Sequence, residues 1–97
     1  MNSTASGRPD TRSAEAIFNQ GVILWNAGKP ADAKKQYEMA LKVDPNHAES
    51  HYWLGVALVS EGNNAGAADE FATYLKIAPN GLNAASAADF LAQTRKK

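Results

Sequence analysis

Residues 14–47, AEAIFNQGVILWNAGKPADAKKQYEMALKVDPNH, are followed directly by a second version of themselves, AESHYWLGVALVSEGNNAGAADEFATYLKIAPNG, at residues 48–81. Twelve of the 34 aligned pairs are identical, and Gly21 pairs with Gly55. Self-similarity at a fixed period of this length is typical of repeat architectures, in which each repeat is one supersecondary unit. This duplicated stretch therefore decides the fold.

Each unit is predicted to contain two helices. In the first unit Ile17, Gly21 and Leu24 recur at the spacing that places them on one helical face. Gly28 ends this helix at a position suited to the left-handed conformation, and Pro30 opens the next one. Nineteen of the 97 residues are alanine, the best helix former, and no alternating run predicts a strand. The fold class is therefore all-α.

Two positions inside the first helices suggest close packing. Glycine within a helix costs about 1 kcal/mol relative to alanine. Gly21 and Gly55 nevertheless hold equivalent positions, each expected opposite a small residue of the next helix, Ala33 or Ala67. We infer that the paired helices touch at the two glycines. Between the units, Asn46 is expected to cap the next helix with its side-chain oxygen.

The period and its motif resemble the tetratricopeptide repeat family, whose signature is W-x2-L-G-x2-Y, then A-x3-F, then P. The matching positions are Gly21, Ala33, Ala40 and Pro45 in the first unit and Leu54, Gly55, Ala67, Phe71 and Pro79 in the second. The departures are Ile17 and His51 for Trp, Gln20 for Leu, Leu24 and Leu58 for Tyr, Tyr37 for Phe, and Tyr74 where Ala40 matches the family's small residue. The resemblance covers residues 14–81. It implies an α-solenoid, a right-handed superhelix of helix pairs whose first helices line a concave, peptide-binding surface.

The two ends of the chain complete the expected domain, residues 13–97. Residues 82–97 are predicted to form a capping helix with an apolar stripe of Ala84, Ala88 and Leu91. Extending the period places Asp89 where the two glycines stand, so no further helix is expected to pack there. Residues 1–12 contain Ser, Thr, Gly and Pro and are predicted to form a disordered leader.

Charge and composition exclude several classes of function. Ten basic residues balance ten acidic ones, which argues against general binding to nucleic acid or to anionic membranes. No apolar run approaches the roughly 18–20 residues that span a bilayer, and residues 1–12 lack the apolar stretch of a secretory signal. We therefore expect a cytoplasmic protein. The absence of cysteine excludes disulfides and thiolate metal sites.

No catalytic constellation is found in the sequence, so we expect no enzyme and no cofactor. His47 and His51 are spaced so that both could approach one metal ion. A metal site needs three or four ligands, however, and only Asp44 and Glu49 are near in sequence. His51 also occupies the family's Trp position, which favours a packed histidine over a metal ligand.

The resemblance implies which residues line the concave face. They are Glu15, Phe18, Asn19, Val22, Trp25 and Asn26 in the first unit, Glu49, Tyr52, Trp53, Val56 and Ser60 in the second, and Asn83, Ser86, Phe90 and Gln93 in the capping helix. Some domains of the family hold the acidic tails of heat-shock chaperones with Lys, Arg and Asn on this face. The corresponding positions here hold Phe18, Val22, Trp53 and Glu49, so that clamp is absent.

These residues predict a protein–protein interaction module that binds an apolar peptide or helix. Glu15 and Glu49 at one edge would prefer a basic residue on the partner. A competing hypothesis is that Trp25 and Tyr52 pack on each other or on Phe90 and fill the groove from within. The domain could also be a self-assembly unit or a part of a longer array. We expect a monomer or a weak homodimer.

Overall fold

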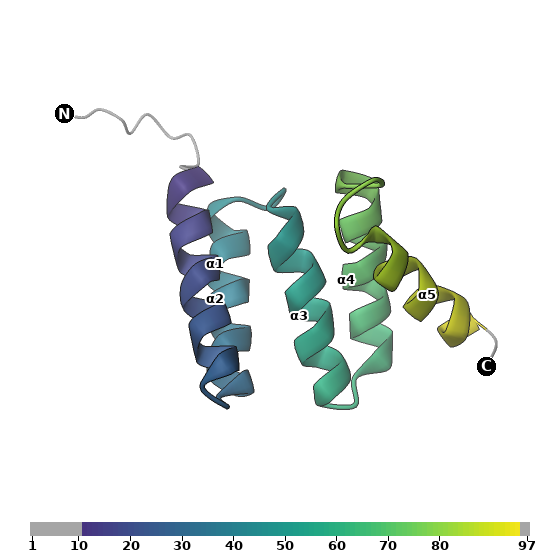
Figure 1. The fold of residues 1–97 in the computed structure, drawn as a ribbon, viewed down its shortest axis with the longest axis horizontal. Coiled ribbons are helices and arrows are strands. Elements are labelled where there is room, and N and C mark those ends of the chain that lie inside the picture. The colour runs from purple at the N-terminus through teal and green to yellow at the C-terminus, as the bar shows by residue number, and fades with distance from the viewer. Residues whose placement is uncertain (1–10, 96–97) are drawn as a thin grey trace.

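The computed structural model describes residues 11–95, which form five helices and no strand (Figure 1). The helices are α1 (Thr11–Asn26), α2 (Pro30–Val43), α3 (Ala48–Ser60), α4 (Asn64–Ile77) and α5 (Ala84–Arg95). The predicted all-α repeat architecture is confirmed. Most of the leader expected over residues 1–12 lies outside the described residues, and its last two positions belong to α1.

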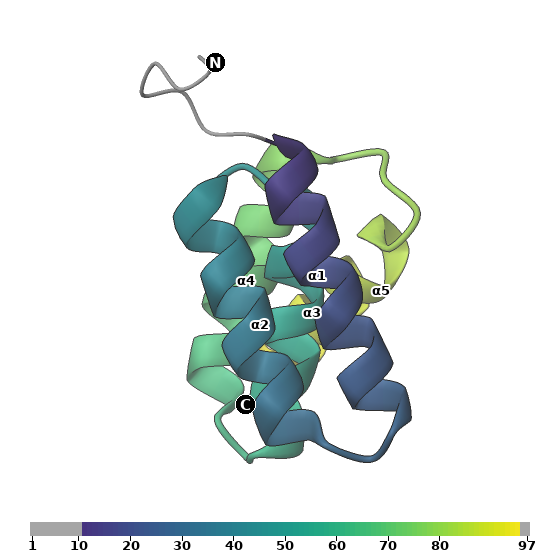
Figure 2. The same ribbon diagram turned by 90° about the vertical axis from the view of Figure 1, so that its left-hand side faces the viewer.

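The helices are arranged in two layers. α1 packs on α2, α2 on α3, α3 on α4, and α4 on α5. Figure 2 shows α2 and α4 on one side of the molecule and α1 and α5 on the other, so the first helices of the units share a face. None of the described helices combines the length and the apolar character that crossing a membrane requires.

Both hairpin turns use glycine in the same way. Gly28 and Gly62 have φ of 80° and 82°, in the left-handed region that glycine adopts without a steric penalty. After α1, the backbone N–H of Lys29 donates to the carbonyl of Leu24 at 2.9 Å, and that of Gly28 donates to Trp25 at 3.0 Å. These two bonds form a Schellman motif, which satisfies the last carbonyls of the helix. The predicted turn at Gly28 is thus confirmed.

The junction between the units differs from the expectation. His47, not Asn46, is the N-cap of α3, and its side chain accepts from the backbone N–H of Ser50. The backbone N–H of Asn46 instead donates to Asp44 Oδ1 at 3.0 Å. Asp44 thus closes a local turn at Asn46, and α3 begins only after His47.

The buried side chains follow the duplication. One cluster is centred on Ala33, Tyr37 and Ala40, and the other on Ala67, Phe71 and Tyr74. Leu58 packs against both clusters and so joins the two units. Tyr74, which departs from the family pattern, is fully buried, and its hydroxyl accepts from the backbone N–H of Asn83 at 3.0 Å. The larger side chain thus ties α4 to the loop that leads into α5.

The two helix glycines lie against aromatic rings. A Cβ on Gly21 would stand 2.5 Å from Tyr37 Cε1, and one on Gly55 would stand 2.7 Å from Phe71 Cε1. Carbon atoms do not approach so closely without displacing their neighbours, and both rings are buried. The close approach inferred from the glycines is therefore present. The atoms that fill the space are mainly those of the rings, although the carbonyl oxygen of Ala33 also lies within 3.3 Å of the Gly21 position.

Helix α5 packs through a different stripe than expected. Ala87 is fully buried against the second cluster, together with the partly buried Ala84 and Leu91, whereas Ala88 is exposed. Five of the twelve residues of α5 are alanine, so few large side chains set its rotation. Asp89 is exposed, as the sequence predicts for its position.

Replacing Gly21 by alanine tests the close contact. The added methyl group would collide with the buried Tyr37 ring, and overpacking of this kind typically costs about 1–3 kcal/mol. The gain in helix propensity, about 1 kcal/mol, offsets only part of this cost. We expect a net loss of up to about 2 kcal/mol in the free energy of unfolding, measured by chemical denaturation. The control is Gln20→Ala at the exposed neighbouring position, which should change stability by less than about 0.5 kcal/mol. A Gly21→Ala variant more stable than the parent would contradict the packing argument.

Candidate functional site

Three helices surround a small hollow on the face of α1 and α3. Its lining consists of Val22, Trp25 and Asn26 from α1, Tyr37 from α2 and Trp53 from α3, and its volume is about 40 Å³. The rings of Trp25 and Trp53 meet edge to face across the two helices, with centroids 6.4 Å apart. We call this feature the α1–α3 hollow.

An aromatic row runs from this hollow toward α5. Trp53 contacts Tyr52 with ring centroids 5.3 Å apart, Tyr52 contacts Phe71 at 5.3 Å, and Phe71 contacts Phe90 at 4.8 Å. Edge-on and tilted ring pairs at such distances are favourable beyond their buried area. The row Trp25–Trp53–Tyr52–Phe71–Phe90 therefore links α1, α3, α4 and α5.

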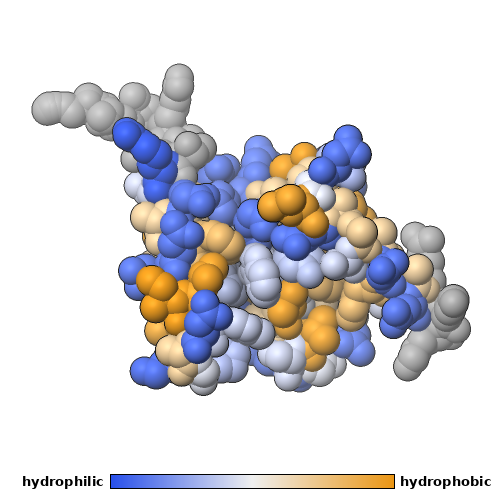
Figure 3. Space-filling view, viewed as in Figure 1, coloured by the Kyte–Doolittle hydropathy of each residue, from blue (hydrophilic) through white to orange (hydrophobic). Residues whose placement is uncertain are grey.

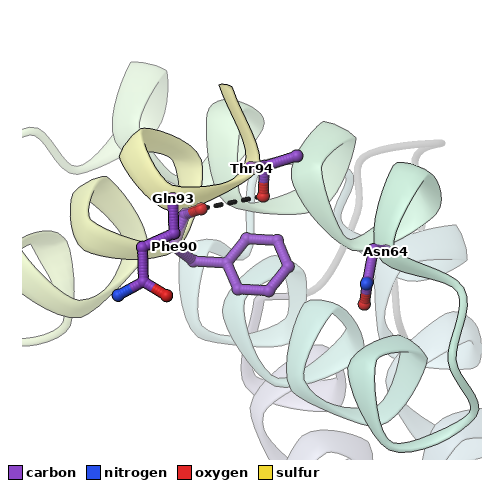
Figure 4. A pocket seen from close by; sticks show the side chains of 4 residues that line it. All are labelled: Asn64, Phe90, Gln93 and Thr94. Carbon is purple, nitrogen blue, oxygen red and sulfur yellow. Dashed lines mark hydrogen bonds between the residues drawn. The ribbon is translucent and has the colours of Figure 1, made fainter. Parts of the chain in front are cut away.

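A second, larger hollow lies between the start of α4 and the end of α5. Asn64, Phe90, Gln93 and Thr94 line it, and its volume is about 300 Å³. Figure 4 shows the Phe90 ring pointing from α5 toward Asn64. The Thr94 hydroxyl donates to the Phe90 carbonyl at 2.8 Å, so it is engaged with its own helix.

The surface of this face carries apolar patches. Orange areas lie over the lower halves of α1 and α3, with paler surface between them (Figure 3). The large exposed hydrophobic residues of these two helices are Ile23, 57% exposed, and Val59, 37% exposed. The hollow thus lies on a face that offers apolar surface on both helices.

The structure brings together some of the residues predicted for the concave face. Val22, Trp25, Asn26 and Trp53 line the α1–α3 hollow, and Phe90 lines the second one. Among the predicted residues that lie outside both linings, Asn19 is exposed, whereas Tyr52 and Val56 are partly buried and pack against the second cluster. In the competing hypothesis Trp25 and Tyr52 pack on each other or on Phe90, whereas in the structure both rings contact Trp53.

Phe18 is a correction to the predicted surface. It is only 8% exposed, and its ring contacts Tyr37 and His47 with centroids 5.6 and 5.2 Å away. His47 lies over it because its Nε2 is hydrogen-bonded to Glu15 Oε1 at 2.7 Å. Phe18 therefore belongs to the core.

The two glutamates at the edge both have partners within the chain. Glu15 bonds His47 but keeps a side chain that is 59% exposed. Glu49 Oε1 accepts from Asn83 Nδ2 at 3.0 Å, which links α3 to the loop before α5. Glu15 is thus the more available of the two for a basic residue.

Sequence reasoning did not select Tyr37, Asn64 or Thr94 as lining residues. Tyr37 occupies a core position of the repeat, and its burial hides its role in the hollow. One signal was present in the sequence, since the second unit has Phe71 where the first has Tyr37. The Tyr37 hydroxyl has no hydrogen-bond partner among the described residues.

The two histidines hydrogen-bond to different carboxylates. His47 contacts Glu15, whereas His51 Nδ1 lies 2.7 Å from Glu70 Oε1 and His51 Nε2 lies 2.7 Å from the Pro45 carbonyl oxygen. Within residues 11–95 no group of three or more His, Cys, Asp or Glu side chains could hold a metal ion. The His51 side chain is 13% exposed and fastens α3 to α4 and to the preceding turn.

A family model described as tetratricopeptide repeat matches residues 18–81. The match covers both glycine–ring contacts and most of the aromatic row. No curated protein sequence matches the chain.

The contacts of His51 predict how stability depends on pH. Both of its partners are acceptors, so only the doubly protonated ring donates to both, and the hydrogen bond to Glu70 raises the pKa of His51. In the unfolded chain the pKa is about 6.5. The stabilisation is therefore complete below about pH 6.5 and is lost as the pH rises through the higher pKa of the folded state. Denaturation at a series of pH values measures this change, and Glu70→Gln should reduce it. An NMR titration that finds His51 at or below its unfolded value would contradict this prediction.

Proposed function

The chain belongs to the tetratricopeptide repeat family, and we propose that it binds an apolar peptide or helix of another protein on the face formed by α1, α3 and α5. Repeats of this family mediate protein–protein interactions and are typically not catalytic. The finer proposal concerns where the partner lies and what chemistry it presents.

The observation that carries the proposal is the α1–α3 hollow with its two tryptophans. Trp25 and Trp53 are both partly exposed, and they lie edge to face around a depression flanked by apolar surface. Tryptophan is among the residues that contribute most to binding energy at protein interfaces, above all where it forms part of a pocket. An apolar side chain of the partner would gain contact with both rings at once.

The aromatic row supports an elongated partner over a single small ligand. The α1–α3 hollow and the Phe90 hollow lie at the two ends of this row. An amphipathic helix with apolar residues at helical spacing could contact the partly exposed ends of this row, Trp25 and Phe90. Glu15, with its largely exposed carboxylate, would favour a basic residue near the partner segment that lies on α1.

The competing hypothesis holds that Trp25 and Tyr52 fill the groove from within. The contacts favour it for Tyr52 and not for Trp25. Tyr52 and Phe71 pack within the second cluster and support the face from below. Trp25 lies at the free end of the row, where its one ring contact is with Trp53 among the described residues. We therefore assign the binding role to Trp25 and a supporting role to Tyr52. In solution we propose a monomer or a weak homodimer.

Trp25→Ala tests the proposed function. A displayed library of 15-residue peptides is selected against the parent domain, and the Kd of each enriched peptide is measured by fluorescence anisotropy. Loss of an interface anchor typically costs about 2 kcal/mol or more, so we expect the Kd to rise at least about tenfold. Because Trp25 is only partly buried, the free energy of unfolding should fall by less than about 2 kcal/mol.

The matched control is Met39→Ala. Met39 is 47% exposed on α2 and lies outside both hollows, so its replacement should change the Kd less than about twofold. Selected peptides that bind Trp25→Ala as tightly as the parent would contradict the proposed site. Analytical ultracentrifugation of the free domain checks the oligomeric state, and a tight dimer at micromolar concentration would contradict the proposed monomer or weak dimer.

A further inference from the structure

The second unit packs on the first through one stripe of α3. The stripe recurs at helical spacing on the side of α3 that contacts α2, and consists of Ser50, Leu54, Ala57 and Glu61. Ser50 and Ala57 are only 0% and 1% exposed, and Leu54 belongs to the first cluster. Glu61 Oε1 accepts from Lys34 Nζ of α2 at 2.8 Å. This stripe is therefore a junction surface.

The corresponding stripe of α1 is uncovered. The residues 34 positions earlier are Ala16, Gln20, Ile23 and Ala27, and all four are exposed. Ile23 is 57% exposed. Although α1 ends at Asn26, Ala27 continues the stripe, because its backbone N–H donates to the Ile23 carbonyl at 3.0 Å. Figure 2 looks onto this end of the molecule, where α1 and α2 lie in front. We call the four residues the α1 end stripe.

The α1 end stripe is separate from the α1–α3 hollow. An α-helix turns by about 100° per residue, so the side chains of Ile23 and Trp25 point in directions about 160° apart. Trp25 contacts Trp53 of α3. Ile23 therefore lies at the outer edge of the face, on the side of α1 that is farther from α3. A partner on the stripe leaves the hollow accessible.

The polar residue of the stripe indicates which partner fits. Three of the four residues are apolar, but Gln20 stands where the second unit has the buried Leu54. A glutamine amide that becomes covered needs both an acceptor and a donor. Another glutamine amide supplies both, because its NH₂ group donates and its carbonyl oxygen accepts. A second copy of the chain, related by a twofold axis, places such a group opposite Gln20.

The spacing of the stripe also suits a twofold axis. Its positions are separated by four, three and four residues, so the pattern is the same in both directions along the helix. In an antiparallel pair, Ala16 of one copy lies opposite Ala27 of the second copy, and the two Gln20 residues lie close to the axis. Alanine at both ends of the contact lets the two helices approach closely.

Charge and size favour a weak association. The formal net charge is zero, so two copies have no net repulsion to overcome. Helix α1 has 16 residues and is about 24 Å long. A contact through one such helix per copy falls short of the roughly 1,200 Å² that stable interfaces bury. We therefore expect a dimer Kd of about 0.1–1 mM.

We propose that two copies of the chain pair through their α1 end stripes, as antiparallel helices about a twofold axis, with the two Gln20 amides hydrogen-bonded to each other. The second copy then covers on α1 what α2 covers on α3. The inference rests on the proposed function only in the oligomeric state, since it assigns the weak homodimer to a surface. It does not depend on the proposed peptide site.

Sedimentation equilibrium at concentrations from about 20 μM to 2 mM measures the association. Ile23→Gln removes an apolar side chain from both copies at once, so it should raise the dimer Kd at least about tenfold. Gln20→Glu places two carboxylates near the axis and should weaken the dimer as well. The matched control is Val59→Gln, which replaces a 37% exposed aliphatic residue of α3 and should change the dimer Kd less than about twofold.

Disulfide cross-linking tests the register, because the chain contains no cysteine of its own. An Ala16→Cys chain is mixed with an equal amount of an isotope-labelled Ala27→Cys chain and oxidised, and the products are identified by mass. A disulfide requires Cα atoms within about 7 Å of each other. The mixed dimer should therefore clearly exceed the half that random pairing gives. A random ratio, or an excess of dimers of one variant with itself, would contradict the antiparallel register.

The outcomes separate this inference from the proposed peptide site. Trp25→Ala should leave self-association unchanged, and a dimer that this variant abolishes would show that the copies meet at the hollow instead. A chain that is monomeric at about 2 mM, or a dimer that is insensitive to Ile23→Gln, would overturn the inference and leave the peptide site standing. Selected peptides that a monomeric chain binds through Ile23 would assign the stripe to another protein and would also overturn it.

Discussion

The contact between a helix glycine and an aromatic ring is the constraint on which this molecule depends. At Gly21 and at Gly55 the first helix of a unit approaches the second so closely that a single methyl group would overlap a buried ring. Each glycine costs about 1 kcal/mol in helix propensity relative to alanine. The burial of a large aromatic side chain against the glycine offsets this cost. Each hairpin is thus held at a separation that its ring sets.

This separation determines what the outer surface can present. Because both hairpins are built in the same way, α1 and α3 stand side by side with equivalent faces toward the same side (Figure 1). Trp25 from one helix then meets Trp53 from the other, although the two do not hold equivalent positions in the repeat. The junction between the two units is fastened by Lys34 with Glu61 at 2.8 Å and by His51 Nε2 with the Pro45 carbonyl oxygen at 2.7 Å. The hollow therefore lies where the two units meet.

Most of the architecture could be predicted because it follows from the spacing of particular residues along the chain. A 34-residue period, paired glycines and the turn at Gly28 depend on local chain geometry, which a sequence displays directly. The predictions were wrong where two neighbouring residues could each occupy the same structural position. Asp44 closes a turn at Asn46, His47 is the N-cap of α3, and the His47 ring packs against Phe18. Because α5 is rich in alanine, the sequence pattern does not fix which face of this helix is buried. Ala87 is buried, where the prediction expected Ala88.

The site was less predictable than the fold, because it depends on differences between the units and not on what they share. Where the two copies agree, as at Ala33 and Ala67, the residue serves packing that both hairpins need. Where they differ, the shared packing does not explain the choice. Tyr74 stands where the first unit has Ala40, and its hydroxyl holds the loop before α5, which only the second unit has to fasten. Tyr37 stands where the second unit has Phe71, and it adds a hydroxyl that no described residue uses, next to a hollow that only the junction of α1 and α3 forms.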